Sequence, residues 1–278
     1  MACVTGGEVV PVPAKFVGGY LESWSTLLPR DLPANYNLVF MAFATLDASG
    51  GAVFGVNQDQ ASLIADIKSR NSQAKPTILS VGGQGGAAAG LGTAAQQDAF
   101  IASVVPVIDQ YGFSGVDWDL EAGVPGGISA SGLATVSRQL KEHYGPSFAI
   151  TMAPFGDPEV VTVYKALALE IKDILTFVGF QNYNDVSVPT CASVLTTMET
   201  WARDCGLRTD QWALGFLHID DWLSLNTPYA TMASIYKDVN MRYPTVRGAW
   251  MWGINEKDQP GGFPFANTLG PVVLRARA

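Results

Sequence analysis

Short apolar runs alternate with longer amphipathic stretches along the chain, and Gly, Pro or Asn marks most junctions between them. The short runs are rich in β-branched residues, which is typical of buried strands. They predict strands at Lys15–Gly19, Asn37–Leu46, Pro76–Gly83, Phe113–Glu121, Ser147–Pro154, Ile174–Asn184, Trp212–His218 and Val246–Ile254. The longer stretches have a helical period and predict helices at Asp59–Arg70, Thr93–Tyr111, Ser131–Tyr144, Glu159–Lys172, Ala192–Asp204 and Tyr229–Arg242, with a weaker one at Phe263–Leu269.

Strands that alternate with helices predict a parallel sheet, because parallel neighbours need a crossover connection. Eight such strands favour a closed barrel over an open doubly wound sheet. The length of 278 residues agrees, since a barrel of this kind typically takes about 250 residues. Only the first crossover, Ser25–Tyr36, lacks a clear helix. No repeat, linker or charge run divides the chain, so we expect an α/β protein with a single (β/α)8 TIM barrel over residues 1–278.

Composition and charge exclude several classes of function. Hydrophobic residues make up 48% and charged residues only 15%, which predicts a compact globular protein and not a disordered one. The net charge of −8 argues against a nucleic-acid partner, since a polyanion needs a basic surface. A neutral substrate is permitted and a polyacidic one is disfavoured. No apolar run approaches the roughly 20 residues that span a bilayer, so we expect no membrane partner.

The three cysteines predict no disulfide framework. Cys3, Cys191 and Cys205 cannot all pair within the chain. The last two flank a predicted helix, whose rise of about 1.5 Å per residue would hold them roughly 20 Å apart. We expect buried, inert thiols and no metal site. The first residues lack the layout of a secretory signal, so either the protein stays inside the cell or the chain is a mature domain with an added Met1.

The most informative predicted strand carries Asp117, Asp119 and Glu121 in alternation with apolar residues. Alternation puts the three carboxyls on one face of a strand, and in a barrel covered by helices that face points inward. Like charges spaced about 6.5–7 Å apart in a confined interior raise the pKa of at least one of them. A carboxyl that keeps its proton near neutral pH can act as a general acid.

Two other interpretations of this strand carry less weight. It could be the solvent-facing edge of a sheet, but a closed barrel has no edge. It could bind a divalent cation, since hard cations take carboxylate ligands. The other predicted strand ends, however, offer Tyr, Gln, Asn and Trp and no further acids.

Short motifs at the ends of several predicted strands resemble those of glycoside hydrolase family 18, the chitinase family. The segment Ser114–Glu121 matches the family signature DxxDxDxE except for Ser114 in place of the first Asp. Because that position begins the strand, we expect the change to affect stability or pKa values and not to abolish activity. Gly19–Trp24 resembles the first strand of the family and the turn after it. Four further segments resemble family motifs on other strands: Ser80–Gly83, Met152–Pro154, Gln181–Asn184 and Gly248–Asn255.

The resemblance implies substrate-assisted catalysis, an exception to the usual two-carboxylate scheme of glycosidases. Glu121 would protonate the glycosidic oxygen, and the 2-acetamido oxygen of the sugar would attack C1. Asp119 would accept a hydrogen bond from the acetamido N–H and stabilise the developing positive charge. Asp117 would share a proton with Asp119 and tune the titration of the group. The Tyr183 hydroxyl would orient the acetamido oxygen, and the product would keep its anomeric configuration.

The resemblance also implies the sugar-binding residues, and no cofactor. Trp252 would form the floor of the site, because the C–H face of a pyranose packs on an indole. We interpret Trp250 mainly as core and His143 as a surface residue, and His218 could line an outer subsite. The remaining candidates for substrate binding are Gln181, Asn184, Met152, the backbone of Gly83, and Tyr20.

These features together predict endo-hydrolysis of β-1,4 bonds between N-acetylglucosamine units of chitin and chitooligosaccharides. Endo action is expected because His218–Thr227 leaves no room for the small α+β insertion that deepens the groove in many family members. An endo-β-N-acetylglucosaminidase acting on the chitobiose core of N-glycans is the alternative. A chitin-binding lectin is disfavoured, since such proteins usually lose the acid that Glu121 supplies. We expect a monomer that is secreted, a location inferred from where chitin is found.

Overall fold

Parallel strands form a closed ring in the computed structural model, which describes residues 9–154, 156–183, 188–218 and 227–275. The ring closes because β1 pairs with β2 on one side and with β9 on the other. Its strands are β1 (Phe16–Glu22), β2 (Leu38–Leu46), β4 (Thr77–Gly83), β5 (Gly115–Leu120), β6 (Ala149–Met152), β7 (Phe177–Gln181), β8 (Trp212–Phe216) and β9 (Gly248–Met251). The prediction of a (β/α)8 barrel is confirmed.

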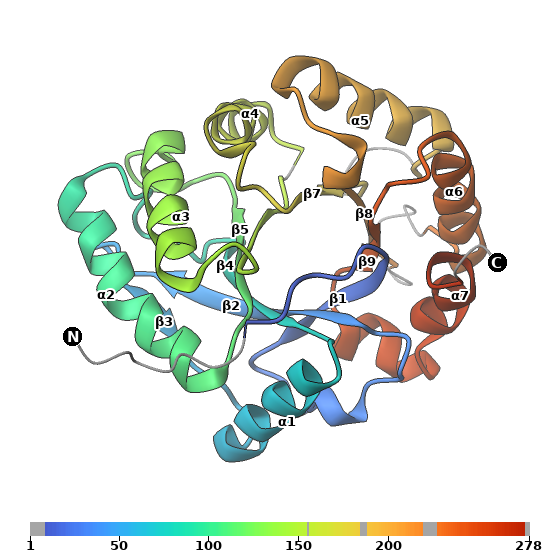
Figure 1. Ribbon diagram of the computed structural model, residues 1–278, viewed down its shortest axis with the longest axis horizontal. Helices are drawn as coiled ribbons and strands as arrows, with labels where there is room; N and C mark the ends of the chain where they lie inside the picture. The colour runs from blue at the N-terminus through green and yellow to red at the C-terminus, as the bar shows by residue number, and fades with distance from the viewer. Residues whose placement is uncertain (1–8, 155, 184–187, 219–226, 276–278) are drawn as a thin grey trace.

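Helices surround the ring of strands, as Figure 1 shows. They are α1 (Gln60–Ser72), α2 (Ala94–Tyr111), α3 (Ala130–Tyr144), α4 (Pro158–Ile171), α5 (Cys191–Cys205), α6 (Tyr229–Arg242) and α7 (Pro264–Val273). The first crossover has only a short 3-10 turn, η1 (Pro29–Asp31), as the sequence predicts. Five helices begin after a side chain that accepts a hydrogen bond from the first turn: Asp59, Thr93, Ser129, Asp157 and Thr190.

The sequence analysis missed one short strand, β3 (Ala52–Phe54), which pairs antiparallel with the end of β2. The turn between them is held by Asp47, whose Oδ1 accepts hydrogen bonds from the backbone N–H groups of Ser49 (2.8 Å) and Gly51 (3.0 Å). Gly50 adopts a φ of 88° there, which favours glycine. A short Gly-rich segment between apolar runs is a hairpin signal that could have identified this strand.

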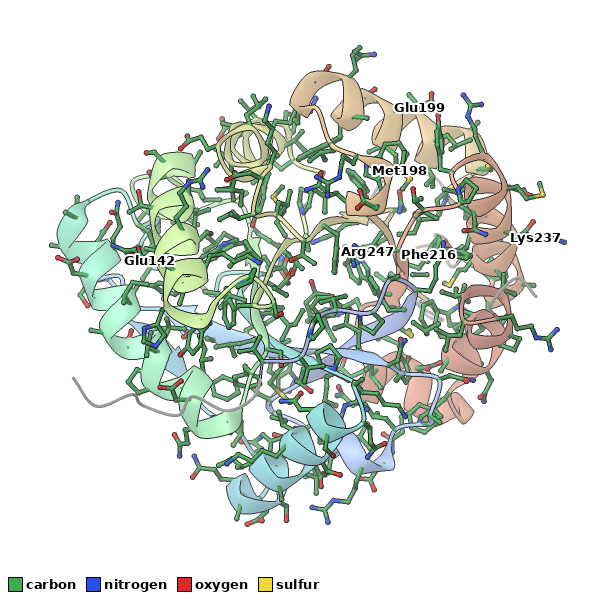
Figure 2. All side chains as sticks on the ribbon, viewed as in Figure 1. Glu142, Met198, Glu199, Phe216, Lys237 and Arg247 are labelled. Carbon is green, nitrogen blue, oxygen red and sulfur yellow. The ribbon has the colours of Figure 1, made fainter. Side chains whose placement is uncertain are left out.

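Side chains fill two layers of core, one between the strands and the helices and one inside the ring. Charged side chains on the helices, such as Glu142 and Lys237, point outward (Figure 2). The inner layer contains the large rings of Phe16, Tyr20, Phe40, Phe177 and Trp250. Nowhere in the described part of the chain does a helix have the length and hydropathy needed to cross a bilayer.

The two cysteines within the described residues lie at opposite ends of α5, and both are free. Ser114, the residue that departs from the motif, is buried just before β5. Its Oγ accepts a hydrogen bond from the backbone N–H of Val10 (3.2 Å). The serine therefore fastens the N-terminal segment to the barrel at the end of β5 away from Glu121, in a structural position.

The Trp250 indole fits inside the barrel because the neighbouring strands have glycine, and no larger residue, at the positions that face it. A Cβ on Gly215 of β8 would lie 2.2 Å from Cζ2 of Trp250, far inside van der Waals contact. We expect Gly215→Ala to lower the free energy of unfolding by about 1–3 kcal/mol, because the core must shift to admit it. Chemical denaturation measures the change.

Gly55→Ala is the matched control, since a Cβ at exposed Gly55 meets no atom within 4 Å. We expect it to leave stability unchanged or to raise it by up to about 1 kcal/mol through the unfolded state. Equal stabilities of the two variants would contradict the close packing of Trp250.

Candidate active site

The acidic strand has the two faces that its alternation predicts. Trp118 packs in the layer between strands and helices, where its Nε1 donates a hydrogen bond to Ser137 of α3 (3.0 Å). Asp117 and Asp119 therefore point into the barrel, and both are almost fully buried, with 1% and 4% of their surface exposed. Glu121 follows the strand and is partly exposed at the mouth.

Asp117 is held by three hydroxyl groups from three different strands. Tyr20 of β1 and Ser80 of β4 donate to its Oδ2, each at 2.8 Å. Thr151 of β6 donates to its Oδ1 at 2.6 Å. Burial raises the pKa of Asp117, and the three donors, of which Thr151 has the largest effect, lower it again. The donors thus favour the ionised carboxylate at a place where burial opposes it.

Asp119 is the carboxyl that most strongly favours its proton. Burial raises its pKa well above the usual range, and the charges of Asp117 and Glu121 raise it further. Its Oδ1 accepts a hydrogen bond from Nε2 of Gln181 (3.0 Å), which lowers the pKa in part. Burial also raises the pKa of Glu121. Two neighbouring carboxyls thus keep protons to higher pH than free carboxyls do.

Tyr183 and Trp252 lie at the same mouth of the barrel. The pKa of Tyr183 is raised by burial and then by the charges of Asp119, Glu121 and Asp117, so its hydroxyl lies within their field. The Trp252 ring is partly exposed and lies 5.5 Å from the ring of Tyr20. The structure therefore gathers the residues that the sequence assigned to catalysis and to the floor of the site.

Glu121 and Gly83 border a pocket of about 480 Å³ between the loops that follow β4 and β5. Its other lining is mainly glycine and alanine. Gly83 has a φ of 77°, and a Cβ there would lie 2.4 Å from the ring of Phe43. Only glycine lets the backbone pass this close to the ring, which leaves its main chain beside Glu121.

The structure corrects two of the residues expected to bind substrate. Met152 is fully buried in the layer between strands and helices, so it faces away from the barrel interior. The inward residue of that strand is its neighbour Thr151, which binds Asp117. Tyr20 points inward but is only 1% exposed, and its hydroxyl is bound to Asp117. It supports the site from below and does not face the opening.

The remaining expectations have different outcomes. Gln181 lies in the site, but its side-chain amide donates hydrogen bonds within the protein, to Asp119 and to the carbonyl of Ala153, each at 3.0 Å. Asn184 lies outside the described residues. Trp250 is core, as interpreted, with 1% of its surface exposed. Within the described residues no cluster of His, Cys, Asp and Glu has the arrangement of a metal site.

Sequence analysis gave no role to several residues that the structure brings to the site. Ser80 and Thr151 hold Asp117, and inward hydroxyls on strands that adjoin β5 were the available signal. Phe43 stacks on Trp252 with ring centroids 5.5 Å apart and planes at 14°. Trp24, with 47% of its surface exposed, lies 6.3 Å beyond Phe43. These rings form an aromatic row, Trp252, Phe43 and Trp24, that leads outward from the floor.

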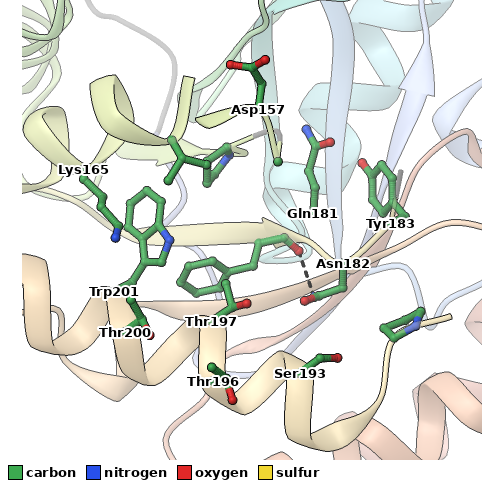
Figure 3. A pocket seen from close by; sticks show the side chains of 15 residues that line it. Asp157, Lys165, Gln181, Asn182, Tyr183, Ser193, Thr196, Thr197, Thr200 and Trp201 are labelled. Carbon is green, nitrogen blue, oxygen red and sulfur yellow. Dashed lines mark hydrogen bonds between the residues drawn. The ribbon is translucent and has the colours of Figure 1, made fainter. Parts of the chain in front are cut away.

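A second hollow of about 630 Å³ lies between α4 and α5, with Gln181 and Tyr183 at its edge (Figure 3). Its charged groups already have structural roles. Asp157 caps α4 by accepting hydrogen bonds from the first turn, and Lys165 forms an ion pair with Asp204 at 2.7 Å. The carboxyl cluster and the aromatic row at the barrel mouth are therefore the better candidate site.

The chain is similar in sequence and fold to known proteins. The chain is 29% identical over 187 residues to "Chitinase ChiA" of Flavobacterium johnsoniae, which covers 55% of this chain and 12% of that protein. It is 29% identical over 228 residues to "Exochitinase 1" of Streptomyces olivaceoviridis, which covers 65% of this chain and 37% of that protein. The matches thus span less than half the length of these two relatives.

A solved family 18 chitinase from Chromobacterium violaceum has the same fold, with a TM-score of 0.83 at 23% sequence identity over 96% of this chain and 85% of that one. The family model "Glycosyl hydrolases family 18" matches residues 17–256, from β1 to the turn after β9. That match includes every strand of the ring apart from the first residue of β1. The chain therefore belongs to glycosyl hydrolase family 18.

Proposed function

We propose that the protein is a chitinase-type glycoside hydrolase that cleaves β-1,4 bonds between N-acetylglucosamine units by a retaining, substrate-assisted mechanism. The observation that carries the proposal is the cluster of Asp119 and Glu121, two carboxyls whose pKa values burial raises, beside Tyr183 and Trp252. Family membership and the chitinase names of the relatives support it.

Glu121 supplies the proton in this mechanism. Its raised pKa keeps the carboxyl protonated at the pH where ordinary carboxyls have ionised. As Glu121 protonates the glycosidic oxygen, the bond from that oxygen to C1 breaks and the acetamido oxygen bonds to C1. The resulting oxazolinium ion is opened by water, which gives a proton back to Glu121. Two inversions at C1 leave the anomeric configuration unchanged.

Asp119 stabilises the positive charge that develops on the sugar. A nearby cation favours its ionised form, which the charges of Asp117 and Glu121 disfavour in the resting site. The ionised carboxylate accepts the acetamido N–H and aligns the amide, while the Tyr183 hydroxyl donates to the acetamido oxygen. Asp117 titrates together with Asp119 as one coupled group.

The aromatic row binds the sugar chain. The C–H face of a pyranose packs on the Trp252 ring, and the exposed ring of Trp24 offers a second surface farther along. β8 ends at Phe216 and α6 begins at Tyr229, so the connection is too short for a wall-forming domain. We infer an open groove that accepts the interior of a chain, and hence endo cleavage of chitin by a secreted, monomeric protein.

The endo-β-N-acetylglucosaminidase alternative uses the same carboxyls and differs in what the groove ends accept. Mass spectrometry of products from chitin oligosaccharides and from an N-glycoprotein, digested in parallel, decides between the two. We expect cleavage of the oligosaccharides. Release of N-glycans alone would move the proposal to the alternative.

Glu121→Gln is expected to lower kcat on a chitin oligosaccharide by about 10²–10⁴-fold, because the amide has no acidic proton. Binding of the oligosaccharide by calorimetry should persist, since the side chain keeps its shape. Glu142→Gln makes the same replacement on an exposed face of α3 and should leave kcat unchanged. Undiminished release by Glu121→Gln would remove Glu121 from the mechanism, and binding without turnover by the unchanged protein would indicate a lectin.

Thr151→Val is expected to raise the pKa of Asp117, because it removes the donor with the largest effect on that carboxylate. A hydrogen bond to a charged group is worth about 1.5–3 kcal/mol, which corresponds to about one to two pH units. The acidic limb of the kcat profile should therefore move to higher pH. Carboxyl NMR titration measures the pKa directly, and an unmoved pKa would contradict the role of Thr151. The control is Thr162→Val on the exposed face of α4.

Cleavage of an end-labelled N-acetylglucosamine hexasaccharide tests endo action. An open groove should release several product lengths from internal bonds in the first turnovers. Release of the disaccharide alone from one end, followed by chromatography over time, would show exo action and overturn the inference drawn from the short β8–α6 connection.

A further inference from the structure

A second carboxyl lies buried at the mouth of the barrel, and the mechanism above does not use it. Glu22 is the last residue of β1, has 0% of its surface exposed, and follows Tyr20 on the inward face of the strand. Its partner across the ladder is Ala42 of β2. Buried carboxyls are uncommon unless they are paired, so the surroundings of this one carry information.

Two reciprocal hydrogen bonds join Glu22 to Asn255. The Asn255 Nδ2 donates to Glu22 Oε2 at 2.7 Å, and the backbone N–H of Glu22 donates to Asn255 Oδ1 at 3.1 Å. Asn255 lies in η3 (Ile254–Asp258), the short helical segment that follows Trp252 and Gly253. The pair therefore fastens the end of β1 to the chain just beyond the proposed floor of the site.

The other carboxyl oxygen lies against Gly253. A Cβ on Gly253 would lie 3.3 Å from Glu22 Oε1, and the φ of 70° at this residue also favours glycine. Glu22 Oε1 has no hydrogen-bond partner among the described residues. An ionised carboxylate needs hydrogen-bond donors at both oxygens, whereas a neutral carboxyl tolerates this environment at lower cost.

The charged groups that act on Glu22 are Glu256 and Lys257, both from η3. Burial raises the pKa of Glu22 most, and the bond from Asn255 lowers it. Glu256 raises it both by its charge and by the approach of its side chain to the Glu22 carboxyl, Lys257 lowers it by its charge, and the pKa rises from 4.5 to about 7. Two further contacts of Glu22 are with uncharged residues: Ala42 of β2 lies beside it, and the Gln58 amide donates to its backbone carbonyl (3.0 Å).

We propose that Glu22 is a positioning residue for Trp252: its neutral carboxyl, clamped by Asn255, holds Gly253 and the start of η3 so that the Trp252 ring stays stacked on Phe43. Ionisation places a second carboxylate near Glu256 and leaves a buried oxygen without a partner, which loosens this segment. That the displaced ring weakens sugar binding rests on the proposed function, which makes Trp252 the platform.

The sign of the pH effect follows from the raised pKa. The folded state keeps the proton of Glu22 to higher pH than the unfolded state does, so the stability it contributes is fully present below pH about 4.5. That contribution is lost as the pH rises through about 7. Glu22→Gln cannot ionise and retains an oxygen that accepts from Asn255, so its melting temperature should exceed that of the parent at pH 8 and match it near pH 4.5.

Tryptophan emission tests the positioning of Trp252 without any sugar. The emission spectrum of the parent minus that of a Trp252→Phe variant gives the emission of the Trp252 ring. We expect this difference spectrum to change as the pH rises through 7. The same difference, measured between Glu22→Gln and the double variant Glu22→Gln/Trp252→Phe, should not change with pH. A pH-dependent difference that is identical with Glu22 and with Gln at this position would overturn the proposal.

Two variants of η3 test the same titration without altering Glu22 itself. Glu256→Gln should move the midpoint of the emission change to lower pH, and Lys257→Gln should move it to higher pH, because their charges act on Glu22 in opposite directions. Midpoints that do not move, or that move together, would contradict the assignment to Glu22.

Calorimetry with an N-acetylglucosamine tetrasaccharide tests the effect on binding in a Glu121→Gln background, which removes the titration of the acid. From pH 6 to pH 8 we expect the affinity of Glu121→Gln for the sugar to fall. This fall should be roughly threefold to tenfold larger than the fall for the double variant Glu121→Gln/Glu22→Gln. Combining Glu22→Gln with Trp252→Ala should abolish that difference. A difference that persists without the Trp252 ring would contradict action through Trp252. If no variant bound the sugar, the proposed function would fail, and the emission experiment would still decide the role of Glu22.

Discussion

The structure depends on keeping ionisable groups inside a barrel that is otherwise packed with aromatic rings. Asp117 remains there because hydroxyls from β1, β4 and β6 surround it, so strands far apart in the sequence must close around one carboxylate. Burial raises the pKa of Asp119, and the charge of Asp117 raises it further. Closure of the ring and the raised pKa of Asp119 are thus consequences of the same packing.

The aromatic side chains packed below the carboxyls position the residues of the site. Trp250 fills the barrel interior where Gly179 and Gly215 leave room, and Tyr20 stands edge-on to it. Tyr183 also meets the edge of Trp250, at 5.9 Å between ring centroids. The residues that touch substrate in the proposed mechanism therefore rest on a rigid stack, which limits the loss of orientation that slows catalysis.

Much of this arrangement could be predicted from periodicity. The ring strands and surrounding helices were expected near their observed places, and period two correctly assigned Trp118 to the outer face and Asp119 to the inner face. The prediction that Met152 binds substrate was wrong, because it followed a family motif. The alternation of the strand, which places Thr151 inward, already places Met152 outward. Strand β3 was missed because three residues are too few to show a period.

The amino-acid sequence was sufficient to predict which side chains share a face, because that depends only on the geometry of a strand or helix. It also determined the order of the elements and, through the carboxyls on one strand, the kind of chemistry. The contacts between side chains of different strands and loops follow from the fold: Thr151 with Asp117, Phe43 with Trp252, and Glu22 with Asn255. Such contacts join residues far apart along the chain, and their distances follow from the closure of the barrel, which no local pattern encodes.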